Sequence, residues 1–166
     1  MASVYLNLGC GGPETHAPEP WWNVDSWEGS EAAIIADVLE LPFEDGSAEA
    51  IYCGHILEHL TYEDEVPRFL REVERLRAEH APVCFVGPDY HRAITNPAWF
   101  GMLEQIQFGD HEHHGSEHRW VATAWNSLLA VKEVFPTVRE IDIVCLSSFW
   151  PVVARIGWQF ALLVED

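Results

Sequence analysis

The sequence predicts an α/β fold with a doubly wound, mostly parallel sheet. Short continuous apolar segments alternate with helix-like segments along the chain, as expected for strands that are buried on both faces. The first apolar segment runs directly into Gly9-Cys10-Gly11-Gly12, and glycine-rich loops at the carboxyl ends of parallel strands are typical ligand sites. Because 166 residues with 48% hydrophobic residues suffice for one core, we expect residues 1–166 to form a single domain.

Seven segments are predicted to be strands because they are short, apolar and bounded by turn residues. They are residues 4–8, 22–25, 33–36, 50–54, 82–87, 138–144 and 158–164. Most of them lack the alternation of polar and apolar residues that a half-exposed strand shows, which favours a sheet covered on both faces.

Two helices are predicted from periodicity and from their end signals. Residues 63–79 carry apolar side chains at steps of three and four, and Thr61 with Asp64 resembles a capping box at the start. A second helix is expected at residues 123–134, ending before Pro136.

Two regions do not fit a regular alternation. Pro13, Pro18 and Pro20 cannot lie inside a regular helix, so the first connection between strands is expected to be short and irregular. Residues 89–119 have no clean period and contain many histidines. Since long connections are usually functional or mobile, we expect this one to be a lid over a substrate site.

The chain is strongly acidic, with 27 Asp and Glu against 9 Lys and Arg and a net charge of −18. This charge repels phosphate backbones and anionic bilayers, so we expect neither nucleic acid nor a membrane as partner. No apolar run could span a bilayer, and no signal peptide is visible. The widely spaced Cys10, Cys53, Cys84 and Cys145 suggest reduced thiols and a cytoplasmic location.

Six sequence stretches occur in a characteristic order over residues 6–89. They are LNLGCGG (6–12), WNVD (22–25), ADVLELPF (36–43), DGS (45–47), IYCGHILEHL (51–60) and GPD (87–89). In this order the chain resembles the class I S-adenosylmethionine-dependent methyltransferases, and among them the small type 11-like family. The resemblance implies a Rossmann-like methyltransferase fold with an antiparallel C-terminal strand, truncated N-terminal helices and S-adenosylmethionine as cofactor.

The resemblance also implies where the cofactor lies. Asp25 would accept the ribose hydroxyl protons, as the acidic residue of dinucleotide folds does, and Asp37 would accept the adenine amine while the Val38 backbone meets the ring. The glycine loop would lie against the methionine part. The complete predicted cofactor set is Leu8, Gly9, Cys10, Gly11, Gly12, Asp25, Ser26, Asp37, Val38, Cys53, Gly54 and His55.

Four histidines are candidates for a catalytic role. His55, His91, His111 and His118 could each take a proton from an acceptor hydroxyl, because imidazole titrates near neutral pH. The sequence does not rank them. For Glu58-His59, which leads into the first helix, we expect packing and capping beneath the site.

The His-rich segment 110–118 raises the alternative of a metalloenzyme, since imidazole and carboxylate together bind transition metals. His114–His118 also fits an H-x-x-E-H pattern, but Gly115 and Ser116 make a poor helix centre. No third ligand stands at a fixed spacing, so we predict no metal site.

The leading functional hypothesis is methyl transfer from S-adenosylmethionine to a small-molecule or sugar-like acceptor, at oxygen or nitrogen. The alternatives are a non-catalytic cofactor-binding or partner protein of the same fold and, less favoured, the metalloenzyme. Because the family's usual N-terminal covering helices are absent, the site is expected to be open, closed by residues 89–119, or covered by a second copy in a homo-oligomer.

Overall fold

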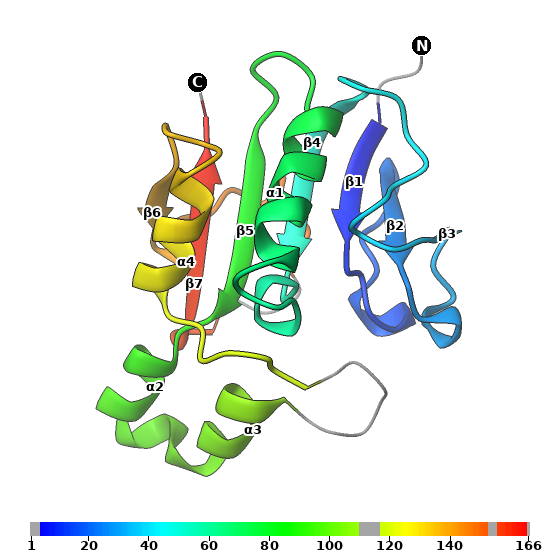
Figure 1. The fold of residues 1–166 in the computed structure, drawn as a ribbon. Coiled ribbons are helices and arrows are strands. Elements are labelled where there is room, and N and C mark those ends of the chain that lie inside the picture. Colours follow the sequence, from blue (N-terminus) through cyan, green and yellow to red (C-terminus); the bar gives the residue numbers. More distant parts are fainter. Residues whose placement is uncertain (1–3, 110–116, 153–155, 166) are drawn as a thin grey trace.

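The computed structural model describes residues 4–109, 117–152 and 156–165 and contains a seven-stranded sheet with the order β3-β2-β1-β4-β5-β7-β6 (Figure 1). The strands are β1 (Val4–Leu8), β2 (Trp21–Asp25), β3 (Ile34–Ile35), β4 (Ala48–Gly54), β5 (Val83–Pro88), β6 (Arg139–Ile141) and β7 (Gln159–Val164). Neighbouring strands from β3 to β5 are parallel, and β7 is antiparallel to both β5 and β6. The predicted mostly parallel sheet with an antiparallel C-terminal strand is confirmed.

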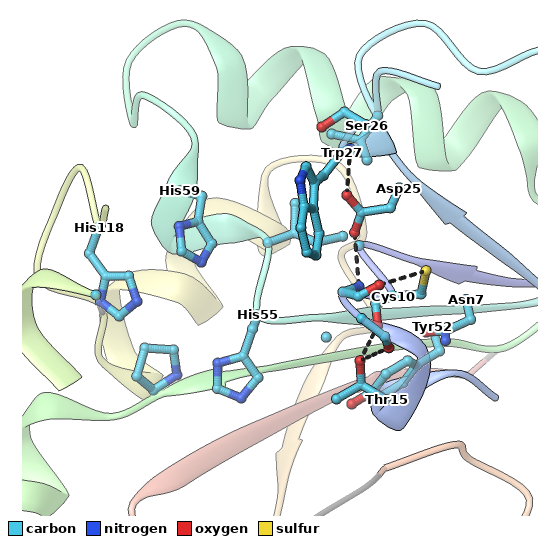
Figure 2. Close-up of a pocket in the computed structure, with 18 of the residues that line it drawn as sticks. Asn7, Cys10, Thr15, Asp25, Ser26, Trp27, Tyr52, His55, His59 and His118 are labelled. Atoms are coloured by element: carbon cyan, nitrogen blue, oxygen red, sulfur yellow. Dashed lines mark hydrogen bonds between the residues drawn. The ribbon is translucent and has the colours of Figure 1, made fainter. Parts of the chain in front are cut away.

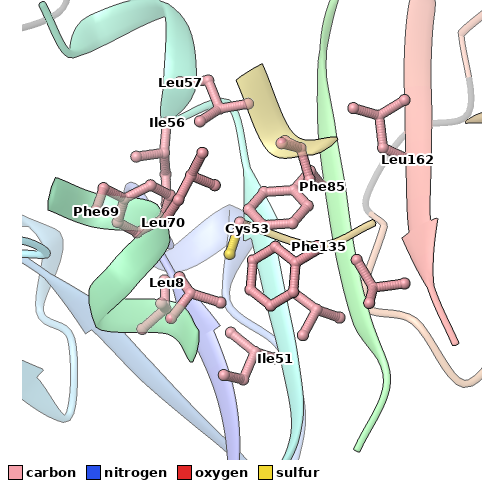
Figure 3. Close-up of a cluster of buried hydrophobic side chains, with 14 of the residues drawn as sticks. Leu8, Ile51, Cys53, Ile56, Leu57, Phe69, Leu70, Phe85, Phe135 and Leu162 are labelled. Atoms are coloured by element: carbon pink, nitrogen blue, oxygen red, sulfur yellow. The ribbon is translucent and has the colours of Figure 1, made fainter. Parts of the chain in front are cut away.

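Two helices cover one face of this sheet. In Figure 1, α1 (Glu65–Leu76) and α4 (Ala124–Lys132) both lie in front of the strands. Their apolar residues join the inward-facing side chains of the strands in one core, part of which is shown in Figure 3. Phe69 and Phe85 are fully buried there and meet edge to face with their ring centroids 6.5 Å apart.

The first helix is shorter than the periodicity of residues 63–79 predicted. At its start, the Thr61 hydroxyl accepts from the Glu65 N–H and the Glu65 carboxylate accepts from the Thr61 N–H, so Glu65 rather than Asp64 completes the cap. At its end, the Ala78 N–H donates to the Ala48 carbonyl at 2.8 Å. This bond ties the chain to the first residue of β4, a central strand, and ends the helix at Leu76.

The opposite face of the sheet carries no α-helix among the described residues. After β1 the chain forms only the 3-10 turn η1 (Pro13–Thr15), so the predicted irregular connection is confirmed. Asn7 donates to the Asn23 carboxamide oxygen, which also accepts from the Ala17 N–H, and these bonds fix the connection. Aromatic side chains cover the sheet nearby, including Trp21 and Trp150 with ring centroids 6.0 Å apart.

Two predicted strands end earlier than expected. The segment 138–144 forms only the short β6, because the Asp142 side chain accepts from the Val144 N–H and starts the 3-10 turn η5 (Ile143–Cys145). The segment 33–36 contributes only the two residues of β3. A further 3-10 turn, η2 (Glu28–Ser30), lies between β2 and β3.

The long connection after β5 contains more regular structure than its sequence predicted. Asp89 accepts from the His91 and Arg92 N–H groups and caps α2 (Tyr90–Thr95), which is followed by η4 (Pro97–Met102) and α3 (Leu103–Phe108). These short helices surround a small cluster of their own, centred on the buried Ala93, Ile106 and Trp158. In Figure 1 they lie beyond the carboxyl end of β5. No helix in the described parts of the chain is long and apolar enough to cross a membrane.

Arg75 on α1 anchors the chain before β4. Its guanidinium binds both carboxylate oxygens of Glu72 and donates to the carbonyls of Leu41 and Phe43 and to the Asp45 carboxylate. We expect Arg75→Ala to lower the free energy of unfolding by about 2 kcal/mol, because several charge-assisted hydrogen bonds are lost together. Urea unfolding measures this, and a loss no larger than that of the control described next would contradict it.

The control is Arg68→Ala, which removes only an exposed ion pair with Asp64 at 3.7 Å. Here we expect the free energy of unfolding to fall by less than about 0.5 kcal/mol.

The stabilisation from the ion pair between Glu72 and Arg75 should also depend on pH. The hydrogen bond from Arg75 holds the pKa of Glu72 below its ordinary value of 4.5. The stabilisation is therefore complete above about pH 4.5 and is lost as the pH falls through the lowered pKa of the folded state.

Candidate functional site

A cavity of about 890 Å³ opens at the carboxyl ends of β1, β2 and β4, a size that suits a cofactor together with a small acceptor. Its walls come from the glycine loop, the ends of β2 and β3, the corner after β4, and the connection 89–119 (Figure 2). The predicted cofactor residues that line it are Gly9, Cys10, Gly11, Gly12, Asp25, Ser26, Asp37, Val38, Gly54 and His55.

Leu8 and Cys53, two other predicted cofactor residues, do not line this cavity. They are register partners on β1 and β4, and both side chains are buried in the core beneath α1 (Figure 3). Because successive side chains of a strand point to opposite faces, the preceding residues Asn7 and Tyr52 point the other way, and both line the cavity. On each of these two strands, the predicted residue is therefore the neighbour of the one that lines the cavity.

The glycine loop has a backbone shape that other residues adopt only with strain. Gly9 and Gly11 both have φ of +64°. A Cβ at Gly9 would lie 2.5 Å from Cγ1 of Ile56, and one at Gly11 would lie 2.9 Å from the Thr15 hydroxyl. That hydroxyl donates to the Gly12 carbonyl at 2.8 Å, so the loop is held in place at its far end. The loop presents bare backbone to the cavity.

Asp25 at the end of β2 fastens the loop to the sheet. Its carboxylate accepts from the Gly11 N–H at 2.8 Å and from the Trp27 N–H at 2.9 Å (Figure 2). Each carboxylate oxygen has a second acceptor position beyond the bond that it makes here. The Trp27 side chain also lines the cavity and is 43% exposed, so an aromatic face stands beside the carboxylate. Asp37, at the next strand end, accepts from the Leu39 N–H at 2.9 Å.

His55 lies at the corner after β4 and is held from both sides. Its backbone has φ of +55°, which a non-glycine residue adopts only where its surroundings enforce it. The Gln159 amide donates to Nε2 at 2.8 Å, so the other nitrogen, Nδ1, carries the proton and donates to Glu58 at 3.0 Å. Burial raises the pKa of the Glu58 carboxyl, but the hydrogen bond from His55 and the neighbouring imidazoles of His55 and His59 outweigh it, so the pKa lies below its ordinary value.

The other predicted catalytic histidines fall in different places. His118 lines the cavity, its Nδ1 lies 3.0 Å from the Ile106 carbonyl, and burial lowers its pKa. His91 does not line the cavity, because it lies on an exposed position of α2. His111 is outside the described residues. His59, for which we expected a packing role, lines the cavity instead.

Comparison with known proteins agrees with this geometry. Residues 22–82 match the family model of a methyltransferase domain. An S-adenosylmethionine-dependent methyltransferase from Archaeoglobus fulgidus superposes with a TM-score of 0.64 at 12% identity, covering 99% of this chain and 86% of that one. The chain has the class I methyltransferase fold. The resemblance noted in the sequence is confirmed by the family model and by the fold together.

Two further methyltransferase structures show the same fold. An S-adenosylmethionine-dependent methyltransferase from Clostridium acetobutylicum has a TM-score of 0.61 at 14% identity, covering 98% of this chain and 83% of that one. A geranyl diphosphate C-methyltransferase from Streptomyces coelicolor, solved with S-adenosyl-L-homocysteine, has a TM-score of 0.56 at 11% identity, covering 98% of this chain and 71% of that one. No curated protein sequence matches the chain.

Several residues that line the cavity were missed by sequence reasoning. They are Asn7, Thr15, Trp27, Tyr52, His59, Trp158 and Gln159. Asn7 and Tyr52 could have been found by applying strand alternation strictly. Gln159 reaches His55 from 104 positions away, on the antiparallel last strand, and nothing in the local sequence marks it.

The thiols of the protein should react unequally. Cys10, Cys53 and Cys84 are buried, and Cys145 is exposed. Burial, with the nearby Asp25 charge, raises the pKa of Cys10 to about 12, and burial raises that of Cys53 as well. We expect iodoacetamide at pH 8 to label only Cys145 rapidly, as read by mass spectrometry of peptides. Rapid labelling of Cys10 or Cys53 in the folded protein would contradict this placement.

Proposed function

We propose that the chain binds S-adenosylmethionine in this cavity and transfers its methyl group to an oxygen or nitrogen of a small-molecule acceptor. The observation that carries the proposal is the arrangement of the cavity. The glycine loop, Asp25 and Asp37 lie along one side, and the His55 corner with residues of the connection 89–119 forms the other. One end can therefore hold the cofactor while the other holds an acceptor.

The residues at the strand ends fit this cofactor. Gly9 and Gly11 lie so close to Ile56 and Thr15 that a Cβ would clash, and backbone rather than a side chain borders the cavity there, which suits the methionine part. Asp25 has acceptor positions for the ribose hydroxyls, and the Trp27 ring beside it offers a face for the adenine. Asp37 and Val38 are proposed to meet the adenine edge.

The other end of the cavity is proposed to hold the acceptor. His55 and His118 face it, together with Met102, Ile106 and Trp158. Apolar and aromatic walls with a few fixed polar groups are usual for small-molecule sites. We propose that residues 89–119 form the lid over this end.

The protein's contribution to transfer is positioning. The cofactor supplies an electrophilic methyl group on sulfur, and no covalent bond to the protein is needed. The Gln159 and Glu58 bonds fix the His55 ring, so this side of the acceptor pocket is rigid. The lid excludes water that would compete for space beside the acceptor.

The net charge of −18 supports a partner other than nucleic acid, and the four cysteines, which form no disulfide with one another, support a cytoplasmic location. The kind of partner and the cytoplasmic location are both parts of this proposal. Covering of the site by a second copy stays a prediction.

Methyl-labelled S-adenosylmethionine tests the proposal directly. Incubation with fractionated small-molecule extract should transfer the label to a small molecule and form one equivalent of S-adenosylhomocysteine per transfer. Gly11→Val, whose added side chain meets Thr15, is the negative control. Binding of both ligands with no transfer in any fraction would support the non-catalytic alternative instead.

A further inference from the structure

Three side chains with metal-binding atoms meet beside the end of the cavity that is proposed to hold the acceptor. One ligand atom each from Glu58, His59 and His118 lie within 4.8 Å of one another. The rings of His59 and His118 meet at an angle of 73°, with centroids 4.9 Å apart (Figure 2). This set differs from the His-rich segment that the sequence suggested, because only His118 belongs to both.

The backbone holds this group together. The Arg119 N–H donates to the Glu58 carbonyl at 2.7 Å, and the Trp120 indole N–H donates to the Leu57 carbonyl at 2.8 Å. These bonds place His118 beside the 3-10 turn η3 (Leu57–His59), although 59 positions separate it from His59 along the chain. The juxtaposition is thus built by the fold.

The protonation pattern of both histidines suits ligation. Nδ1 of His59 lies 3.2 Å from the Glu117 carbonyl, and Nδ1 of His118 lies 3.0 Å from the Ile106 carbonyl. A carbonyl only accepts, so each Nδ1 carries the proton and each Nε2 has a free lone pair. Metal-ligating histidines are usually oriented in this way, by donating their other N–H to a carbonyl or carboxylate.

Glu58 supplies the second, independent observation. Its side chain is fully buried, yet its Oε2 has no hydrogen-bond partner within the described ranges. The His55 N–H satisfies only Oε1. A buried carboxylate oxygen without a partner is costly, and an ion would satisfy it.

We propose that Glu58, His59 and His118 bind one divalent transition-metal ion, of the class that includes Zn²⁺, Fe²⁺ and Co²⁺. Two imidazoles and one carboxylate are a donor set that such ions prefer over Mg²⁺ or Ca²⁺. Tetrahedral bonds of about 2.1 Å need ligand atoms about 3.4 Å apart, so small side-chain rotations complete the site. His59 and His118 line the cavity, so the ion's remaining position is open to it, as in catalytic rather than structural sites.

Calorimetry with Zn²⁺ on chelator-treated protein tests this proposal. Because the sequence has other histidines nearby, all titrations use the His111→Ala, His113→Ala, His114→Ala background. We expect one Zn²⁺ per chain, and we expect His59→Ala and His118→Ala each to weaken binding at least about 100-fold. His80→Ala, an exposed histidine far along the chain from all three ligands, is the matched control and should bind as the background does.

Circular dichroism shows that each variant is folded, and His59→Gln replaces His59→Ala should the latter unfold. The Co²⁺ absorption spectrum reports coordination without any need for activity. We expect a visible d–d band in the background protein that is lost when His118 is replaced. Absence of stoichiometric binding in the background, or binding that persists in His59→Ala and His118→Ala, would overturn the proposal. Neither result bears on S-adenosylmethionine binding, which is measured separately.

Discussion

The Asp25→Ala variant is expected to bind S-adenosylmethionine at least about 100-fold more weakly than the unaltered protein. Its carboxylate is proposed to accept two ribose hydroxyls, and hydrogen bonds to a charged group contribute about 1.5–3 kcal/mol each. It also accepts from the Gly11 and Trp27 N–H groups, so its loss releases the glycine loop from β2. Calorimetric titration measures the change.

Two further variants separate the loss of the Asp25 carboxylate from a general effect of removing an acidic side chain. Asp25→Asn keeps one acceptor oxygen and should retain part of the affinity. Glu63→Ala removes an exposed carboxylate outside the cavity and should bind normally. Equal affinities for Asp25→Ala and Glu63→Ala would show that Asp25 has no part in binding.

Gly9→Val is expected to cost about 2–5 kcal/mol of folding free energy and to abolish cofactor binding. The residue has φ of +64°, which a β-branched side chain adopts only with strain, and its Cβ would lie 2.5 Å from Cγ1 of Ile56. Ile56 is itself buried against the core, so it has little space to move away. Urea unfolding gives the stability, and a thermal-shift titration gives the binding.

Gly101→Val is the matched control. Gly101 lies in η4, and a Cβ there meets no atom within 4 Å among the described residues. We expect its stability to change by less than about 0.5 kcal/mol. A similar loss in both variants would mean that glycine at position 9 is not required by the loop geometry.

The parts of the fold that could be predicted from the sequence are those set by local chemistry. Each strand of the parallel sheet is a short apolar run, and the apolar stripe of α1 shows directly in its spacing of three and four. Gly9, Gly11 and Asp25, which line the cavity, could be named from the sequence because close backbone approach and a strand-end carboxylate leave a recognisable pattern.

Other features depend on contacts between distant segments, which one sequence does not show. The helices within residues 89–108 are too short for a clear period and are fixed by packing against Trp158. The end of α1 is set by the bond from Ala78 to β4, and the His55 ring is set by Gln159 from the last strand. Glu58 looked like a packing residue because only the folded chain brings His118 beside it.

Calorimetric titration of the unaltered protein with S-adenosylmethionine tests the central claim most directly. The structure supports one cofactor site per chain, formed by the glycine loop, Asp25 and Asp37. We therefore expect saturable binding of one molecule per chain, with S-adenosylhomocysteine competing for the same site. No binding by the folded, unaltered protein would contradict the account.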